Sequence, residues 1–94
     1  MESDGFEWDD AKAEANLRKH KVSFAEGQTV FNDLYSIVES DEGHALDEAR
    51  WTATGLSEQG RVLLVVFTMR GERSRIISAR EPTPAERSAY ESQF

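Results

Sequence analysis

Four arginines crowd the most strand-like part of the chain, which reads LLVVFTMRGERSRIISAR from Leu63 to Arg80. Besides Arg80, they are Arg70, Arg73 and Arg75. A guanidinium carries a fixed charge and a planar fork of donors, which suits phosphate or carboxylate oxygens. In a chain of formal net charge −7, such clustered positive charge needs a counterpart. The segment is therefore a candidate site for a polyanion or an acidic partner.

Cleavage of RNA without a metal ion is the reaction that these residue types favour. The ribose 2′-OH is its own nucleophile, so an enzyme has to orient it, move protons and offset charge on the phosphate. Arginines offset that charge with preorganised donors. The candidates for proton transfer are His20, His44 and Glu48, and histidine is the residue type that titrates near neutrality. His20 is expected at a helix C-terminus, where a cation is also simply stabilising, and His44 in a solvated loop.

Several other kinds of chemistry lack the residues they need. The chain has no cysteine, which excludes a disulfide framework and a thiolate metal site. It also lacks a G-x-S-x-G element and a phosphate-cradling glycine loop. His20 and His44 are 24 residues apart, which is not the spacing of a local metal motif. Neither a metal nor another cofactor is therefore expected.

Charge is unevenly distributed along the chain. Residues 1–48 hold thirteen acidic residues and four Lys or Arg, whereas residues 49–94 hold five acidic residues and seven arginines. The negative total argues against a general nucleic-acid binder, because long-range attraction to phosphate would be weak. The acidic start, MESDGFEWDD, lacks the apolar stretch of a signal peptide, and no apolar run reaches the roughly 20 residues of a membrane span. A cytoplasmic location without a membrane partner is expected.

The elements that must position these residues are predicted to form one α+β domain over residues 1–94. Apolar and capping patterns indicate helices at residues 11–20, from 23 to 31, and at 84–92. Alternating β-type residues indicate strands at residues 34–38, 50–54, 61–69 and 73–79. The predicted order is ααββββα, with two N-terminal helices, a four-stranded antiparallel sheet and a C-terminal helix.

The last two predicted strands form a hairpin if residues 71–72 make a two-residue turn. Arg70 then lies opposite Arg73, and Thr68 lies opposite Arg75. Because residues two apart in a strand share a face, these four side chains are predicted to cluster on one side of the sheet. A three-residue loop would change the grouping.

Other candidate residues are predicted to lie away from this cluster. With the same register, Arg80 falls beside Leu63 on the opposite face of the sheet. Tyr90 lies on the C-terminal helix, where it is expected to dock the helix, although its hydroxyl can reach a site on the sheet. Trp8 precedes the first helix, where an aromatic residue serves packing more often than base stacking.

The sequence also resembles a known family over about residues 6–91. Two motifs carry the resemblance: W-D-x-x-K-x-x-x-N-x-x-K-H, from Trp8 to His20, and R-I-I-S-A-R, from Arg75 to Arg80. Together they are similar to the BrnT toxin family. The family usually has a glycine after the Lys-His pair, where this chain has Lys21, so the first helix is expected to end differently.

The resemblance implies a small ribonuclease with a RelE-like sheet. Such a protein is the toxin of a type II toxin–antitoxin system, and it inhibits translation by cleaving RNA. Its implied partner is a BrnA-type ribbon-helix-helix antitoxin, a DNA-binding protein that represses the operon. Operator DNA would then be reached only through the antitoxin.

Residue roles follow from the reaction and the resemblance together. His20 or Glu48 is expected to handle protons, and Arg70 and Arg80 are expected to act on the charge of the transition state. Contacts with substrate are expected from a further set of residues: Lys19, Arg50, Arg73, Arg75 and Tyr90.

Two other functions fit parts of the sequence. The acidic excess is consistent with a non-enzymatic binding module, which stabilises a DNA-binding antitoxin and modulates operon repression, because a basic partner segment could fold over this surface. A sequence-specific DNA-binding domain is disfavoured, since no basic recognition helix is visible.

Overall fold

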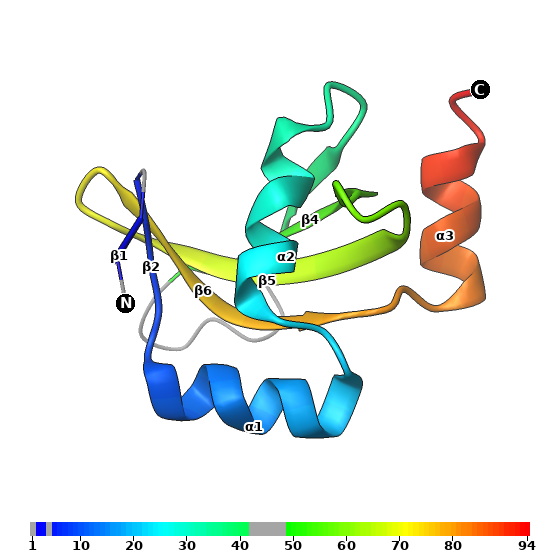
Figure 1. Cartoon of the computed structure of the whole chain (residues 1–94). Helices are drawn as coiled ribbons and strands as arrows, with labels where there is room; N and C mark the ends of the chain where they lie inside the picture. Colours follow the sequence, from blue (N-terminus) through cyan, green and yellow to red (C-terminus); the bar gives the residue numbers. More distant parts are fainter. Residues whose placement is uncertain (1, 4, 42–48) are drawn as a thin grey trace.

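The computed structural model describes residues 2–3, 5–41 and 49–94 (Figure 1). Within these ranges the strands are β1 (Glu2–Ser3), β2 (Phe6–Glu7), β3 (Ile37–Ser40), β4 (Trp51–Leu56), β5 (Val62–Arg70) and β6 (Arg73–Arg80). The helices in the same ranges are α1 (Asp10–His20), α2 (Phe24–Thr29), the 3-10 turn η1 (Val30–Asn32) and α3 (Pro84–Glu91). None of the helices in this described part of the chain is long and apolar enough to cross a membrane.

The prediction of an α+β fold is confirmed, but the predicted sheet was incomplete. In the described residues the sheet has six strands in the order β1-β2-β6-β5-β4-β3, and it is mixed, because β2 runs parallel to β6. The two N-terminal helices therefore follow β1 and β2 instead of opening the chain. Each of these strands has two residues, which is too short for an alternating pattern to be read from sequence.

Side-chain caps begin the helices where the sequence places them. Asp9 accepts a hydrogen bond from the Lys12 N–H at 3.1 Å, and Thr83 and Glu86 form a complete capping box at α3. At α2 only half of the predicted box forms, because the carboxylate of Glu26 bonds to other partners. The strand predicted at residues 34–38 begins later, at Ile37.

The end of α1 differs from expectation. Lys21 has a φ of 59°, in the left-handed region, and its N–H donates to the Leu17 carbonyl at 3.0 Å. This is the ending that glycine usually provides, so the expected change in the helix ending was wrong. The helix therefore ends in the usual left-handed conformation, and the Cβ of Lys21 makes that conformation less favourable than it would be for glycine.

The core lies between one face of the sheet and the helices α1 and α2. Buried side chains from both layers fill it: Val22, Phe24, Val30, Ala53, Leu63, Val65, Phe67, Ile76 and Ala79. Gly27 allows α2 to approach closely, since a Cβ there would lie 3.2 Å from the Ala79 Cβ and 3.3 Å from a Val65 methyl. In Figure 1 α3 stands apart from α1 and α2.

Asn16 attaches α1 to the edge of β6. Its amide donates to the Ala79 carbonyl at 2.7 Å and accepts from the Ala79 N–H at 3.2 Å, as a neighbouring strand would. The same amide donates to the Val22 carbonyl at 2.9 Å. One buried side chain thus covers a part of the β6 edge beyond the pairing with β2.

Candidate functional site

The arginine-bearing hairpin has the predicted register near its turn. Arg70 pairs with Arg73, and Thr68 pairs with Arg75. Directly opposed residues of antiparallel strands point to the same face, so these side chains share the face of the sheet that α2 does not cover. The prediction of an arginine cluster next to the turn is therefore confirmed.

The prediction for Arg80 was wrong, because β6 contains a bulge. Val66 pairs with Ser78 but Phe67 pairs with Ile76, which leaves Ile77 without a partner on β5. The extra residue reverses the alternation of side chains beyond it. Arg80 consequently pairs with Leu64 and lies on the face that carries Thr68 and Arg75.

Arg75 is bound to a carboxylate from the short parallel strand. Its Nη1 lies 2.6 Å from an oxygen of Glu7, and both side chains are more than two-thirds buried. Arg73 donates to the Phe6 carbonyl at 3.2 Å in the same strand, and Arg70 has interactions of its own. Sequence reasoning missed Glu7, since nothing local indicates that residues 6–7 pair with residues 74–75.

Arg80 is bound to Glu86 in the first turn of α3. Its two terminal nitrogens donate to the two Glu86 oxygens at 2.8 and 3.1 Å, and Nη1 also donates to the Glu81 carbonyl. The Arg80 fork, opposed by burial and helped by the Thr83 N–H, lowers the pKa of Glu86 to about 2. The same pairing raises the pKa of Arg80. Glu86 is thus a fixed anion at neutral pH.

Arg50 directly precedes β4 and belongs to the same face by the continued register. The Thr68 hydroxyl donates to the Ala49 carbonyl at 2.6 Å, and the Asp41 N–H donates to the Arg50 carbonyl at 2.8 Å. Continued by one residue, the pairing of β4 with β5 puts Arg50 beside Thr68. Its side chain forms no hydrogen bond or ion pair with any residue in the described ranges. Arg50, Thr68 and Arg75 therefore form a row across three strands.

The arginines of this face occupy two separate positions along the strands. Thr68 and Leu64, the β5 partners of Arg75 and Arg80, are four residues apart, which is roughly 13 Å at about 3.3 Å per residue. The structure therefore brings Arg50, Arg70, Arg73 and Arg75 together and leaves Arg80 at the other end of the face.

The proposed proton-transfer residues have different placements. His20 and Lys19 end α1, which is fixed to β6 at Ala79, next to Arg80. Neither side chain forms a hydrogen bond with another residue of the described ranges. Glu48 and His44 lie outside the described residues.

Tyr90 docks α3 and is not open to a ligand. Its buried hydroxyl donates to the Asp33 carboxylate, and burial together with this bond raises the pKa of Tyr90 to about 12. Burial acts to raise the pKa of Asp33, but hydrogen bonds from the Leu56 N–H, Tyr90 and the Tyr35 N–H outweigh it and lower that pKa. The expectation of a docking residue therefore describes Tyr90 better than that of a substrate contact.

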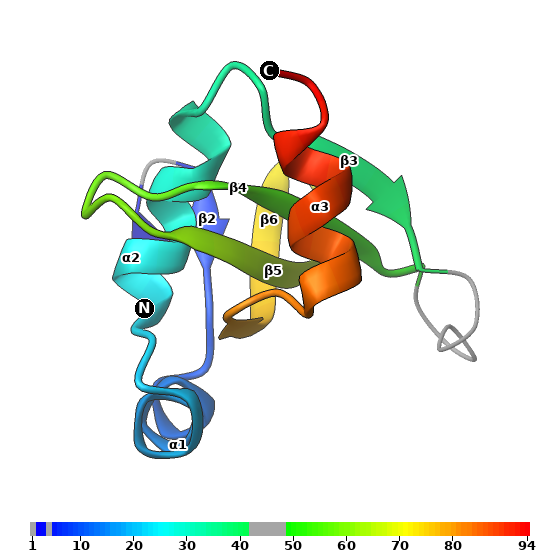
Figure 2. The same cartoon turned by 90° about the vertical axis from the view of Figure 1, so that its right-hand side faces the viewer.

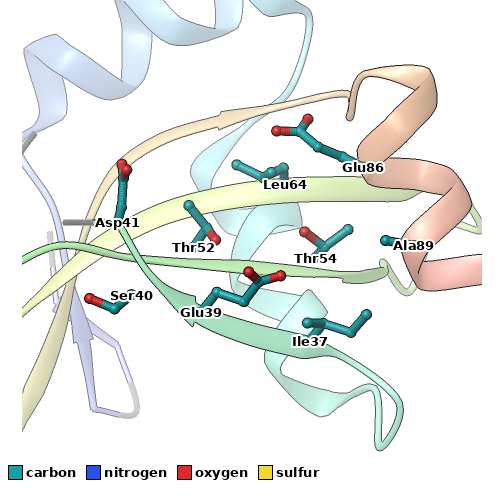
Figure 3. A pocket seen from close by; sticks show the side chains of 9 residues that line it. All are labelled: Ile37, Glu39, Ser40, Asp41, Thr52, Thr54, Leu64, Glu86 and Ala89. Atoms are coloured by element: carbon teal, nitrogen blue, oxygen red, sulfur yellow. The ribbon is translucent and has the colours of Figure 1, made fainter. Parts of the chain in front are cut away.

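An acidic pocket of about 270 Å³ occupies the end of the face between β3, β4 and α3 (Figure 3). Its polar lining consists of Glu39, Ser40, Asp41, Thr52, Thr54 and Glu86. Figure 2 shows α3 crossing in front of β4 and β5, which closes this end of the face. In the described part of the chain no group of three or more His, Cys, Asp or Glu is placed to hold a metal ion.

Comparisons with known proteins agree with this architecture. The model of the family described as "Ribonuclease toxin, BrnT, of type II toxin-antitoxin system" matches residues 8–86. Among solved structures, the crystal structure of the Brucella abortus ribonuclease toxin BrnT is similar, with a TM-score of 0.63. The two sequences are 23% identical, and the match covers 83% of this chain and 95% of the Brucella chain, which supports the fold. No curated protein matched the sequence.

Proposed function

Because the chain belongs to the BrnT family of ribonuclease toxins of type II toxin–antitoxin systems, we propose that it is a metal-independent endoribonuclease that inhibits translation. Its inhibitor would be a BrnA-type antitoxin, and operator DNA would be reached only through that partner. The observation that carries the proposal is the row formed by Arg50, Thr68 and Arg75 on the sheet face that α2 does not cover. A cytoplasmic location follows from RNA as the substrate.

The row would bind the RNA backbone. Neighbouring strands are about 4.8 Å apart, so two long arginine side chains on either side of Thr68 can converge on one phosphate. Arg50 has no carboxylate partner among the described residues, which favours it as a phosphate contact. Arg70 and Arg73 lie two residues closer to the hairpin turn than Thr68 and Arg75, and they would contact the next phosphate.

Arg80 and His20 would carry out the chemistry at the other end of the face. Arg80 uses three of its five N–H donors on Glu86 and Glu81, which leaves two for a phosphate oxygen. Glu86 is a poor base, because its pKa is about 2. We propose His20, at the end of α1, as the proton-transfer group, with Lys19 beside it in sequence. Glu48 remains an alternative base that the described residues do not place.

A direct test incubates purified protein with RNA and excess chelator, and maps new 5′ ends. We expect cleavage to continue with chelator, and Arg80→Ala to lower the rate by about 100-fold, as removal of a preorganised charge donor does. Arg87→Ala is the matched control, since Arg87 forms an exposed ion pair with Glu91 on α3. Full cleavage by Arg80→Ala would reject its catalytic role, and loss of cleavage with chelator would reject metal independence.

A second function, a non-enzymatic binding module, is favoured by the ion pairs of Arg75 and Arg80. Each of these guanidinium groups already has a carboxylate partner, so its charge is partly compensated. Absence of cleavage by folded protein, on naked RNA and with translating ribosomes alike, would support this function. A protein that stops a cell-free translation reaction while cleaving its messenger would exclude it.

A further inference from the structure

The acidic pocket has no role in the cleavage proposed above. The pocket lies at the β3 side of the sheet, whereas Arg75 and Arg80, which are paired with carboxylates, lie on β6. Two of its carboxylates, Glu39 and Asp41, form no side-chain hydrogen bond or ion pair with any residue that the structure describes. The third, Glu86, is satisfied by Arg80. Within the described residues, the negative charge of Glu39 and Asp41 is therefore uncompensated.

Thr54, a buried residue, also lines the pocket. Thr54 is 8% exposed, and its side chain forms no hydrogen bond within the described ranges. In the described ranges, every side-chain oxygen that is fully buried has a hydrogen-bond partner. The Thr54 hydroxyl has no partner there, so it must be accessible to solvent, and the pocket provides that access. Figure 3 shows Thr54 and Glu39 on the same side of their strands. The Thr54 hydroxyl is therefore available to a ligand or to water in the pocket.

We propose that this pocket binds the guanidinium of an arginine side chain supplied by the antitoxin, a proposal that depends on the toxin–antitoxin function. The polar lining is rich in hydrogen-bond acceptors: carboxylate oxygens of Glu39, Asp41 and Glu86, together with the hydroxyl groups of Ser40, Thr52 and Thr54, which can also accept. A guanidinium has five donors and no acceptor, so it complements such a lining. Apolar groups of Ile37, Leu64 and Ala89 also line the pocket and suit the aliphatic stem of the arginine.

Charge complementarity decides between the possible occupants. An RNA phosphate would be repelled by the unpaired carboxylates, and a divalent ion lacks a set of three described ligands. A polypeptide partner of this acidic chain, whose net charge is −7, gains from basic side chains. The arginines of the face would then bind RNA, and the acidic pocket on the β3 side would anchor the partner.

The test uses the peptide Ac-Gly-Arg-Gly-NH2 as probe, titrated into ¹⁵N-labelled full-length protein. We expect the amide signals of Thr52 and Thr54 to shift in a saturable manner. The same peptide with citrulline, which keeps the shape and removes the charge, should leave them unchanged. The double variant Glu39→Gln/Asp41→Asn should weaken binding at least roughly fivefold, because it removes two charges next to the guanidinium.

The control variant is Glu14→Gln/Glu58→Gln, which removes two charges from exposed positions elsewhere and should bind like the unmodified protein. Absence of shifts at the pocket, equal binding of the citrulline peptide, or equal loss in both double variants would overturn the proposal. Larger shifts of the same amides with Mg²⁺ alone would identify a metal site and overturn it as well. RNA cleavage is measured without peptide, so failure of this proposal and failure of the ribonuclease proposal are distinguishable.

Discussion

At the scale of single residues, Glu86 joins two parts of the chain with one carboxylate. It accepts the Thr83 N–H at 2.8 Å, which completes the start of α3, and it binds the fork of Arg80 at the end of β6. The capping bond and the ion pair therefore depend on the same ionised group. Loss of its charge would weaken the attachment of α3 to the sheet.

This dual role predicts a pH-dependent stability difference for Glu86→Gln. The folded-state pKa of Glu86 is about 2, below its ordinary value of 4.5, so its charge stabilises the fold above pH 4.5 and this contribution is lost as pH falls towards 2. At pH 7 the variant should be less stable by about 1 kcal/mol, after allowance for solvent screening of a partly exposed pair. Urea unfolding at pH 7, 5, 4 and 3 should show the gap narrowing below pH 4.5.

The control for that measurement is Glu91→Gln on the same helix, whose exposed pair with Arg87 should contribute little at any pH. A gap between Glu86→Gln and the unmodified protein that stays constant down to pH 3 would contradict the assignment of the pKa.

Single residues also show what the sequence could predict about the site. The arginines were recognisable, because their chemistry is independent of the fold. Their partners Glu7 and Glu86 were not, since Glu7 meets Arg75 only through a parallel strand pair 68 residues away in sequence. Residue patterns alone therefore did not show which arginines are paired with a carboxylate.

At the scale of elements, the bulge in β6 determines the shape of the face. One unpaired residue moves Arg80 to the side that carries Arg75, and residue patterns do not reveal a bulge. Helix boundaries were predicted well because caps are local, as Asp9 and the Thr83–Glu86 box show. Strand β2 was missed because its long-range pairing with β6, and not local propensity, makes it a strand, and β1 pairs only with β2.

Lys21 offers a test of the α1 ending. Its backbone is already in the left-handed region at φ 59°, where glycine has no Cβ penalty. Lys21→Gly should therefore stabilise the protein by about 0.5–1 kcal/mol, less the loss of the Lys21 hydrogen bond to the Arg18 carbonyl. Thermal or urea unfolding measures the change. Lys19→Gly, inside the last turn of the helix, should instead destabilise, and a destabilised Lys21→Gly would contradict the proposed strain.

The attachment of α1 predicts a large cost for Asn16→Ala. The substitution leaves the Ala79 N–H and the Val22 and Ala79 carbonyls without their side-chain partner in a buried position. A cost of roughly 2–4 kcal/mol is expected from unsatisfied buried groups. Hydrogen exchange should become faster at the Ala79 amide, whereas Asn32→Ala, at an exposed bond to Glu58, should change stability little. Unchanged protection at Ala79 would show that another group covers this edge.

At the scale of the whole molecule, the charge of the face opposes the charge of the chain. Arg50, Arg70, Arg73 and Arg75 share a few strand positions, whereas the net charge is −7. RNA capture must therefore depend on short-range contacts with the row, because the long-range field of the protein repels the substrate. Added salt lowers RNA affinity by weakening the phosphate contacts, and it raises RNA affinity by screening the repulsion.

This balance predicts a shallow dependence of RNA affinity on salt. Three phosphate contacts give a slope of about −2 for log affinity against log salt with single strands, at about −0.7 per contact, and screening of the repulsion makes the slope shallower still. Arg50→Ala should weaken binding of a short single-stranded RNA and make the slope less negative by about 0.7, because one contact is lost.

Fluorescence anisotropy between 50 and 300 mM KCl, conditions chosen for about a sixfold range of salt, measures both the affinity and the slope. Arg87→Ala lowers the net charge by the same amount on α3 and should keep the slope of the unmodified protein. An identical change in slope for both variants would show that overall charge, and not the row on the sheet, governs RNA binding.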